Sequence, residues 1–366
     1  MVIISKPGPK FRLAILTLGV LIFSLVLDFP VFADSISVSD LTQLIAATAQ
    51  TGELPSSNSI QLTQDIVVDR QLAEGFAGTL NGNNHAISLT NGIGEISARP
   101  LFGNLYGATV ENLIINMATD EATINGLGML TQYANPDTVI NGVHVKGIIT
   151  SGNEGTGGIV GWNRGSILNS SADVIVKGTT KVGGIAGISH GDITNSTSSG
   201  EITGDMYVGG IVGYKEDSDV TNSSSSALVT GSNYVGGIAG IDITGLISNS
   251  YTTGEISGGN RIGGLVGEEN SQISDSYSSA NVTGSENIGG LVGILINSDW
   301  RYVTSIENSI STGRVVGTIY VGGLAGVNSS SEIVNSSSLS AVSGSVFIGG
   351  LIGLNGGTIS KSSAQG

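Results

Sequence analysis

Residues Gly187–Gly191 spell Gly-Ile-Ser-His-Gly, which matches the Gly-x-Ser-x-Gly pattern that presents a nucleophilic serine in α/β hydrolases. That chemistry needs a strand leading directly into a helix and a separate base to take the serine proton. Here the pattern occupies a turn after a repeated Gly-Gly motif, and other copies of this turn hold unrelated residues such as Trp162 or Glu268. We therefore predict no nucleophile at Ser189 and no catalytic residue elsewhere in the chain.

Metal-ligating residue types are present, but they lack the spacing of a known metal site. The three histidines are His85, His144 and His190, and they fall in different repeats. Carboxylates gather in the turns after two Gly-Gly motifs, at Glu216, Asp217, Asp219, Glu268 and Glu269. A weak calcium site is one interpretation of these turns, but the ordered ligand loop of an EF-hand is missing. A solvated acidic face is favoured, and we predict no metal and no cofactor.

Aromatic residues make up only 5% of the chain, so their positions are informative. Several directly precede a Gly-Gly unit, and an inserted loop adds others of the types enriched in binding hot spots. If the residue after each of them faces inward, the aromatic column faces outward. The candidate ligand-binding residues are Tyr207, Tyr234, Tyr320, Trp300, Arg301 and Tyr302. Two interpretations stay open for the column: contacts to sugars or partner proteins, and rings that stack from coil to coil.

The overall composition restricts the classes of function. Of 366 residues, 57 are glycine, 39% are hydrophobic and 12% are charged, so the chain can fold around an apolar core. The net charge of −15 repels phosphate backbones, and we predict no nucleic-acid partner. The chain has no cysteine, which excludes disulfides, thiolate nucleophiles and cysteine-bound zinc.

The first 33 residues have the pattern of a secretory signal peptide. Basic residues at Lys6, Lys10 and Arg12 precede an apolar stretch of 15 residues, which is shorter than the ~20 needed to span a bilayer. The small-residue site ends at Ala33, so we predict cleavage there and a secreted or cell-surface protein. An uncleaved membrane anchor is the alternative, and no later segment is apolar enough to cross a membrane.

A repeat governs the chain after residue 150. A six-residue pattern occurs eight times: a small or apolar residue, two glycines, Ile or Leu, any residue and a final glycine. Its copies start at Thr156, Val182, Val208, Val235, Ile262, Ile288, Val321 and Ile348. Successive copies are 26 or 27 residues apart, except for one interval of 33 that contains the inserted loop. Each repeat holds three short β-like runs, whereas a propeller blade needs ~40–50 residues and helical repeats need a 3.6-residue stripe. The sequence predicts an all-β fold, a right-handed parallel β-helix of 26–27-residue coils.

A column of amides recurs in step with these coils, and Lys361 takes its place in the last one. The predicted structural ladder is Asn112, Asn141, Asn169, Asn195, Asn222, Asn249, Asp275, Asn308 and Asn335. An Ile or Val lies two positions before most of them, and strand side chains two apart share a face. We therefore expect the amides at or near the interior, where stacked amides can donate and accept hydrogen bonds between coils.

The two ends of the chain differ from the repeats. Asp40 can cap a short helix, Leu41–Ala49, that would cover the first coil. We divide the mature chain into a cap with irregular coils at residues 34–100 and a β-helix at residues 101–366. The last unit starts at Ile348 and lacks the third run of earlier units. We expect a monomer whose final coil frays beyond Lys361, docks another chain, or belongs to a longer protein.

The repeat units Val208–Gly213 and Ile262–Gly267 resemble the GLUG motif, as do the segments Ile247–Gly254 and Ile273–Ala280. The lead-in Phe76–Leu89 is similar to the segment that usually precedes these repeats, so the resemblance covers roughly residues 60–366. Proteins with this motif are mostly exported bacterial surface proteins. They include adhesins of the filamentous haemagglutinin type and the non-catalytic part of some IgA proteases.

The resemblance implies a non-enzymatic adhesin or stalk, and the aromatic column suggests a glycan or a surface protein as its partner. It implies no catalytic residue, since the His-Glu-x-x-His motif of the peptidase part is missing. The alternative is a β-helical polysaccharide lyase or glycosidase, or a carbohydrate-binding module. Paired carboxylates, or three or more Asp, Lys or Arg side chains converging in one groove, would favour the enzyme.

Overall fold

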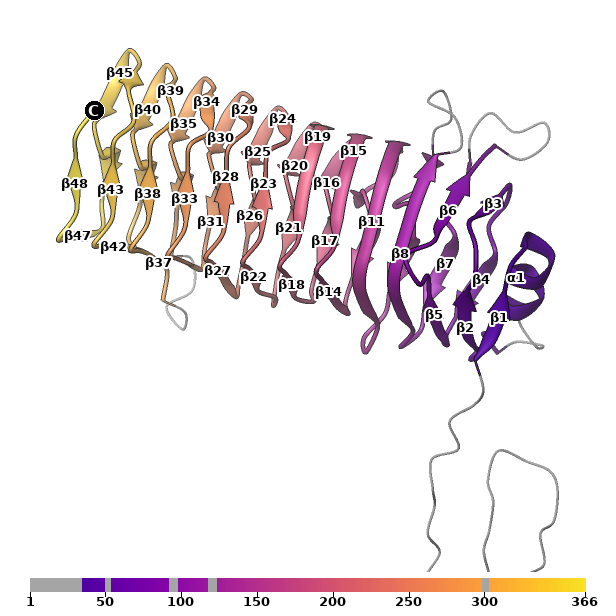
Figure 1. Ribbon diagram of the computed structural model, residues 1–366. Coiled ribbons are helices and arrows are strands. Elements are labelled where there is room, and N and C mark those ends of the chain that lie inside the picture. Colours follow the sequence, from indigo (N-terminus) through magenta and orange to yellow (C-terminus); the bar gives the residue numbers. More distant parts are fainter. Residues whose placement is uncertain (1–34, 50–53, 92–97, 118–123, 298–302) are drawn as a thin grey trace, which may run out of the picture.

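Each repeat forms one coil of a solenoid, and its strands pair in parallel with the equivalent strands of the next coil (Figure 1). The computed structural model describes residues 35–49, 54–91, 98–117, 124–297 and 303–366. The pairing register follows the sequence repeat, because Val182 pairs with Val208, and Val208 pairs with Val235. The predicted all-β parallel β-helix is confirmed.

Three sheets run along the solenoid in the described residues. The eleven-stranded sheet consists of β4 (Ala73–Phe76), β7 (Phe102–Leu105), β10 (Thr131–Ala134), β13 (Val160–Asn163), β17 (Ala186–Ser189), β21 (Val212–Lys215), β26 (Ala239–Asp242), β31 (Val266–Glu269), β36 (Val292–Leu295), β41 (Ala325–Asn328) and β46 (Ile352–Asn355). The eight-stranded sheet consists of β12 (Thr156–Gly157), β16 (Thr180–Gly183), β20 (Met206–Gly209), β25 (Asn233–Gly236), β30 (Asn260–Gly263), β35 (Glu286–Gly289), β40 (Ile319–Gly322) and β45 (Val346–Gly349).

The third sheet has 29 strands, because two or three short strands of each later coil belong to it. Its strands before the regular repeats are β1 (Ile36–Val38), β2 (Ser59–Leu62), β3 (Ile66–Val68), β5 (Thr79–Asn81), β6 (Ala86–Leu89), β8 (Thr109–Met117), β9 (Ile124–Asn125) and β11 (Val139–Thr150). Its later strands are β14 (Ser166–Leu168), β15 (Ser171–Lys177), β18 (Ile193–Thr194), β19 (Thr197–Thr203), β22 (Val220–Thr221), β23 (Ser224–Ser225), β24 (Leu228–Thr230), β27 (Leu246–Ser248), β28 (Tyr251–Thr252), β29 (Glu255–Ser257), β32 (Gln272–Ser274), β33 (Tyr277–Ser278), β34 (Asn281–Thr283), β37 (Ser305–Glu307), β38 (Ile310–Ser311), β39 (Val315–Val316), β42 (Glu332–Val334), β43 (Ser337–Ser338), β44 (Val342–Ser343), β47 (Thr358–Ser360) and β48 (Ser363–Ala364).

A single coil shows how the interior is filled. Val235, Ile238, Ala239, Ile247 and Ile256 all point into the coil and are buried. The equivalent residues of neighbouring coils pair in register with them, so the side chains form continuous apolar columns along the solenoid. Burying each Ile or Val stabilises the fold by about 1.5–3 kcal/mol.

The Gly-Gly pairs allow the chain to bend between two inward-facing residues, as their spacing predicts. Val182 and Ile185 are both buried, and β16 ends at Gly183. Neither Gly183 nor Gly184 has a left-handed φ, so backbone freedom does not explain the need for glycine here. The reason is space, because a Cβ on Gly183 would lie 2.1 Å from the Ala186 carbonyl oxygen.

The helix α1 (Leu41–Thr48) covers the first coil, as predicted (Figure 1). Asp40 is the N-cap, and its carboxylate accepts a hydrogen bond of 2.9 Å from the backbone N–H of Gln43. Leu44 and Ala47 are buried against the core. No helix in the described part of the chain is long and apolar enough to cross a membrane.

The amide column is not in the interior, so this part of the ladder prediction is wrong. Asn195 is exposed, as are most other members of the column, although Asn141 is half-buried. From Asn169 onward each member has a left-handed backbone with φ between 47° and 51°. Such a residue turns the chain and breaks the two-residue alternation, and asparagine is among the few residue types that adopt this conformation readily. Some amides still bond between coils, such as Asn195 Nδ2 to Asn169 Oδ1 at 3.2 Å.

A serine column takes the interior place that we predicted for the amides. The serine after each amide is buried in most coils, and its backbone N–H donates to the hydroxyl of the next serine. The Ser170 N–H to Ser196 Oγ distance is 3.2 Å, and the Ser196 N–H to Ser223 Oγ distance is 3.1 Å. These bonds satisfy polar groups that burial would otherwise penalise.

The last coil ends the column of inward-facing residues. Ile348 takes the position of the buried Val321 but is 46% exposed. β48 pairs with β43, and the expected fraying beyond Lys361 stays a prediction. The predicted signal peptide, residues 1–33, lies outside the described residues.

Candidate functional site

Two tyrosines stack on the outer face of the solenoid. Tyr251 in β28 and Tyr277 in β33 pair in register, so their rings come from adjacent coils. The ring centroids lie 4.9 Å apart with an interplanar angle of 1°. The two side chains are 38% and 44% exposed. One face of the Tyr251 ring is therefore covered by Tyr277, and its other face points toward the preceding coil.

The preceding coil leaves that face of Tyr251 open. Ser224 pairs with Tyr251 and is too small to cover the ring. A groove of about 470 Å³ lies here across β15, β19, β23 and β28, and serine and threonine make up most of its lining. Its outer residues include Asp173, Thr197, Ser199 and Thr253. We call this feature the tyrosine groove.

The tyrosine groove is close to neutral. Asp173 is the single charged residue of its lining. The Asp173 carboxylate lies 3.4 Å from the Lys146 ammonium and accepts a 3.2 Å hydrogen bond from the Ser199 hydroxyl. Loss of solvent contact, with a smaller effect of the Tyr251 hydroxyl, raises the pKa of Tyr277, so the Tyr277 hydroxyl stays neutral at physiological pH. The groove thus offers one aromatic face and several hydroxyls.

The predicted aromatic column shows contacts between coils. Tyr207 and Tyr234 lie 4.6 Å apart between ring centroids, and Tyr320 lies 5.0 Å from Phe347. The Arg261 guanidinium covers the Tyr234 ring at 4.6 Å and donates a 2.7 Å hydrogen bond to its hydroxyl. These rings are therefore partly covered by their neighbours, and ligand binding by the column stays a prediction.

The other predicted binding residues lie on the inserted loop. Trp300, Arg301 and Tyr302 fall outside the described residues. Their role as ligand contacts remains a prediction.

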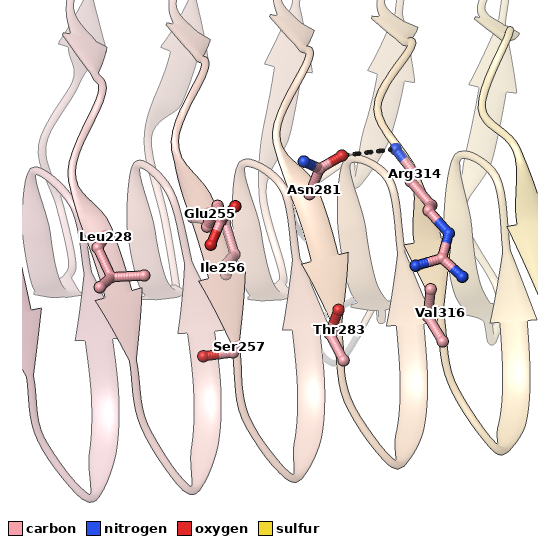
Figure 2. Close-up of a pocket in the computed structure, with 8 residues that line it drawn as sticks. All are labelled: Leu228, Glu255, Ile256, Ser257, Asn281, Thr283, Arg314 and Val316. Atoms are coloured by element: carbon pink, nitrogen blue, oxygen red, sulfur yellow. Dashed lines mark hydrogen bonds between the residues drawn. The ribbon is translucent and has the colours of Figure 1, made fainter.

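A smaller groove of about 230 Å³ crosses β24, β29, β34 and β39 (Figure 2). Figure 2 shows Asn281 between Glu255 and Arg314, with the Asn281 Oδ1 accepting a 3.2 Å hydrogen bond from the Arg314 backbone N–H. Glu255 is the single carboxylate of this lining. Glycoside hydrolysis uses two carboxyl groups, so this groove lacks the required pair.

Charged residues converge in a third groove, of about 590 Å³, at the turns that follow the eleven-stranded sheet. Its charged or titratable lining residues are Asp137, Arg164, His190, Asp192 and Asp217. Two of the carboxylates hold neighbouring turns together. Asp192 Oδ1 accepts a 2.9 Å hydrogen bond from the Asp219 backbone N–H, and Asp217 Oδ1 accepts one of 2.8 Å from the Thr244 hydroxyl. This groove meets our stated condition for reconsidering an enzyme.

Ser189 is not presented as a nucleophile. Its side chain is buried, donates a 2.6 Å hydrogen bond to the Gly191 carbonyl and accepts one of 3.0 Å from Asn163 Nδ2. His190 lies 3.8 Å from Glu216 rather than in a position to deprotonate Ser189. The described residues contain no group of three or more His, Asp or Glu side chains that could hold a metal ion.

The prediction of a solvated acidic face is wrong for Glu269. Glu268 is partly exposed and lies 3.0 Å from the Arg261 guanidinium, but Glu269 is completely buried. Strand β31 ends at Glu269 and turns its side chain into the coil, beside the equally buried Asp242 and Lys215. We name these three residues the buried triad.

Sequence reasoning missed Lys215 and Asp242. Each ends a strand of the eleven-stranded sheet, and Asn163 and Ser189 hold the same position in the two coils before them. Aligning the repeats on the Gly-Gly motif would have placed all of these residues in one column. The alignment alone would not have shown that this column is buried, because the burial of Asn163 and Ser189 is known only from the structure.

Comparisons with known proteins agree with the repeat. Residues 284–316 match the family model described as the GLUG motif. An immunoglobulin A1 protease from Streptococcus pneumoniae is 31% identical over 128 residues, which is 34% of this chain and 6% of that protein. An immunoglobulin A1 protease from Streptococcus sanguinis is 38% identical over 99 residues, which is 26% of this chain and 5% of that protein.

A solved structure was also found. It is a Bacteroides ovatus protein provisionally assigned as an immunoglobulin A1 protease, with 19% identity and a TM-score of 0.34 over 78% of this chain and 76% of that one. A TM-score of 0.34 is too low to support a conclusion about this chain. The predicted resemblance to GLUG-motif proteins and to IgA proteases is confirmed by the sequence matches. The chain therefore carries the GLUG motif on a parallel β-solenoid and is similar to short segments of immunoglobulin A1 proteases.

Proposed function

We propose that this chain is an exported, non-catalytic surface protein that binds neutral glycans in the tyrosine groove. The solenoid serves as the stalk that holds this groove. The GLUG motif and the similarity to segments of immunoglobulin A1 proteases support a surface β-solenoid. The chain spans 6% and 5% of those two relatives, so we assign none of their enzymatic activity to it.

The observation that carries the proposal is the open ring face of Tyr251. A pyranose ring has apolar C–H faces that pack on an aromatic ring, and hydroxyls that bond to polar groups around it. In the groove, a sugar on Tyr251 would continue the Tyr277–Tyr251 stack over Ser224, with Thr197 and Ser199 at hydrogen-bonding positions further along. The spacing of about 4.8 Å between coils is close to the length of one sugar unit, so an oligosaccharide can run along the solenoid.

Charge selects the class of glycan. The chain has a net charge of −15, and the single charged residue lining the groove is Asp173. An acidic glycan would be repelled by both, whereas a neutral glycan meets no such penalty. We therefore expect neutral hexose-containing oligosaccharides to bind and uronic or sialic acids to be excluded.

The test is binding of the purified protein to an array of neutral and acidic oligosaccharides. We expect signals on neutral glycans and a loss of about tenfold or more in Tyr251→Ala, equivalent to ~1.4 kcal/mol of binding free energy. Tyr106→Ala is the matched control, because Tyr106 is 48% exposed and does not line the groove. Equal losses in both variants, or signals confined to acidic glycans, would contradict the proposal.

The alternative is an enzyme that acts on polysaccharides at the charged turn groove. It is favoured by the convergence there of three carboxylates, Arg164 and His190. Against it, Asp192 and Asp217 already hold the turns together, so Asp137 is the carboxylate left for chemistry. Release of reducing ends or unsaturated sugars by the purified protein, lost in Asp137→Asn, would establish the enzyme and displace our proposal.

A further inference from the structure

The buried triad joins three successive coils. Lys215, Asp242 and Glu269 end the neighbouring strands β21, β26 and β31 and pair in register. The Lys215 Nζ lies 2.7 Å from Asp242 Oδ1, and it also donates a 2.9 Å hydrogen bond to the Thr244 carbonyl oxygen. Gly245 makes room for the amine, because a Cβ there would lie 2.9 Å from the Nζ.

All three side chains are completely shielded from water. Each has an exposed fraction of 0%. Asp242 Oδ2 and Glu269 Oε2 have no hydrogen-bond partner among the described residues, and the two residues pair in register on adjacent strands. Two neighbouring carboxyl groups that are shielded from water repel each other unless one of them carries a proton. The triad therefore contains one amine, one carboxylate and one carboxylic acid in a dry site.

Proton positions follow from the burial. Burial, strengthened by the charge of Asp242, raises the pKa of Glu269 well above its usual value. Burial raises the pKa of Asp242 to about 6 even though Lys215 opposes the shift. We assign the proton to Glu269, because the Lys215 amine contacts Asp242 and favours the charged form of that carboxyl group.

We propose that Lys215 and Asp242 form an intramolecular isopeptide bond, with Glu269 as the proton carrier. This arrangement brings the nucleophile, the electrophilic carbon and an acid together. Holding reactants in place is equivalent to a very high effective concentration. The exclusion of water also opposes hydrolysis of the product.

The reaction is a condensation that balances without any further reagent. Lys215 passes a proton to Asp242, which gives a neutral amine and a neutral carboxylic acid. The Nζ attacks Cγ of Asp242, while Glu269 donates its proton to one carboxyl oxygen and later takes back the proton that the Nζ gives up. The C–O bond of Asp242 breaks, one water molecule leaves, and the Nζ–Cγ amide bond remains.

The product fits the same surroundings. The amide keeps one N–H, and the Thr244 carbonyl oxygen at 2.9 Å is already placed to accept from it. The amide oxygen of Asp242 can accept from the protonated Glu269. The bond also removes a separated charge pair from the interior, where desolvation makes ions costly. It would tie two successive coils of the stalk together covalently.

Tryptic digestion of the denatured full-length protein tests the bond directly. Between Lys181 and Arg261 the only trypsin site is Lys215, so an unlinked chain gives peptides 182–215 and 216–261. A lysine in an amide bond is not cleaved. We expect a single peptide, 182–261, with a mass lower by one water molecule than its sequence requires. Two separate peptides, or the single peptide at its full mass, would overturn the proposal.

Two controls separate the bond from other causes. Glu269→Gln keeps the Lys215–Glu216 cleavage site and should yield the two peptides, because Gln cannot carry the proton. A bond that still forms in this variant would overturn the role of Glu269. Lys146 and Asp173 also pair in register, at 3.4 Å, but both are exposed. Normal cleavage at Lys146 in the same digest shows that contact without burial does not produce the bond, and a linked Lys146 would contradict the importance of burial.

Discussion

Two positions in each regular coil hold a residue with a left-handed backbone. At the amide position the sequence uses Asn in most coils, with φ between 47° and 51°. At the position before the Gly-Gly unit it uses Lys, Tyr, Arg, Asn and Phe, with φ between 54° and 59°. An L-residue outside the Asn and Gly types pays about 1–2 kcal/mol for this conformation. The second corner therefore retains strained residues, and contacts between coils, such as Tyr207 with Tyr234, accompany them.

The left-handed backbone, rather than burial, should decide which substitutions the amide column tolerates. Asn222 is exposed with a φ of 51°. We expect Asn222→Gly to be nearly neutral and Asn222→Ala to lower the free energy of unfolding by about 1 kcal/mol relative to the Gly variant. Urea denaturation of the two variants measures the difference. Equal stability of both would show that the corner does not depend on the backbone conformation.

Removing the cation of the buried triad should leave a pH response that the two buried carboxyl groups control. In Lys215→Met no isopeptide bond can form, so Asp242 and Glu269 remain as two buried carboxyl groups whose pKa values are raised in the folded state. A raised folded pKa gives stability that is present below the unfolded value of about 4 and is lost as the pH rises through the folded value. We expect this variant to have a higher Tm near pH 4.5 than near pH 7.5.

A matched variant isolates that effect from other carboxylates. Lys215→Met combined with Asp242→Asn and Glu269→Gln keeps the cavity but removes both titrating groups. Asp219, which also acts on Asp242, is unchanged in both variants. The difference between their Tm values should shrink at acidic pH, as followed by circular dichroism. Parallel pH profiles would show that the buried carboxyls do not control stability.

At the scale of an element, the Gly-Gly corner depends on close approach between coils. A Cβ on Gly237 would lie 2.4 Å from both the Gly264 carbonyl oxygen and the Thr252 Cγ2. We expect Gly237→Ala to lower the free energy of unfolding by about 1–3 kcal/mol, since the backbone of the adjacent coil would have to move. Gly152→Ala is the control, because no atom lies within 4 Å of its added Cβ. Equal denaturation midpoints would contradict the crowding at the corner.

The strands themselves are too short to be stable alone, and pairing along the axis compensates for this. Many strands have two to four residues, such as β22 (Val220–Thr221), yet each pairs with an equivalent on both sides in the inner coils. The free energy of unfolding of such a solenoid is approximately the sum of the contributions of the individual coils and of the interfaces between neighbouring coils.

At the scale of the molecule, the regular coils place features of distant sequence in one line. Tyr251 and Tyr277 become one stacked surface, and Lys215, Asp242 and Glu269 become one buried triad. The proposed functions use the two faces of the same architecture. The outer face presents the aromatic ring to a glycan, while the inner face brings together the groups of a covalent cross-link between coils.

The sequence by itself determined the period, the fold class and the helical cap. The 26- or 27-residue spacing of the Gly-Gly units, the recurring Ile and Val columns and the capping Asp40 are local patterns, and each maps onto a strand corner, a core column or α1. Local patterns suffice here because every coil repeats the same short-range choices and contacts mainly its neighbours.

Only the tertiary structure decided which polar columns face inward. A left-handed residue such as Asn195 breaks the two-residue alternation, so the exposed amide precedes a buried serine, contrary to the sequence prediction. Glu269 also lies inside the coil, beside Asp242, although no residue of β31 has a left-handed backbone. At the amide position, the backbone conformation of one residue therefore decides whether the side chains after it face water or the core. That conformation is a property of the folded coil and cannot be predicted from residue spacing alone.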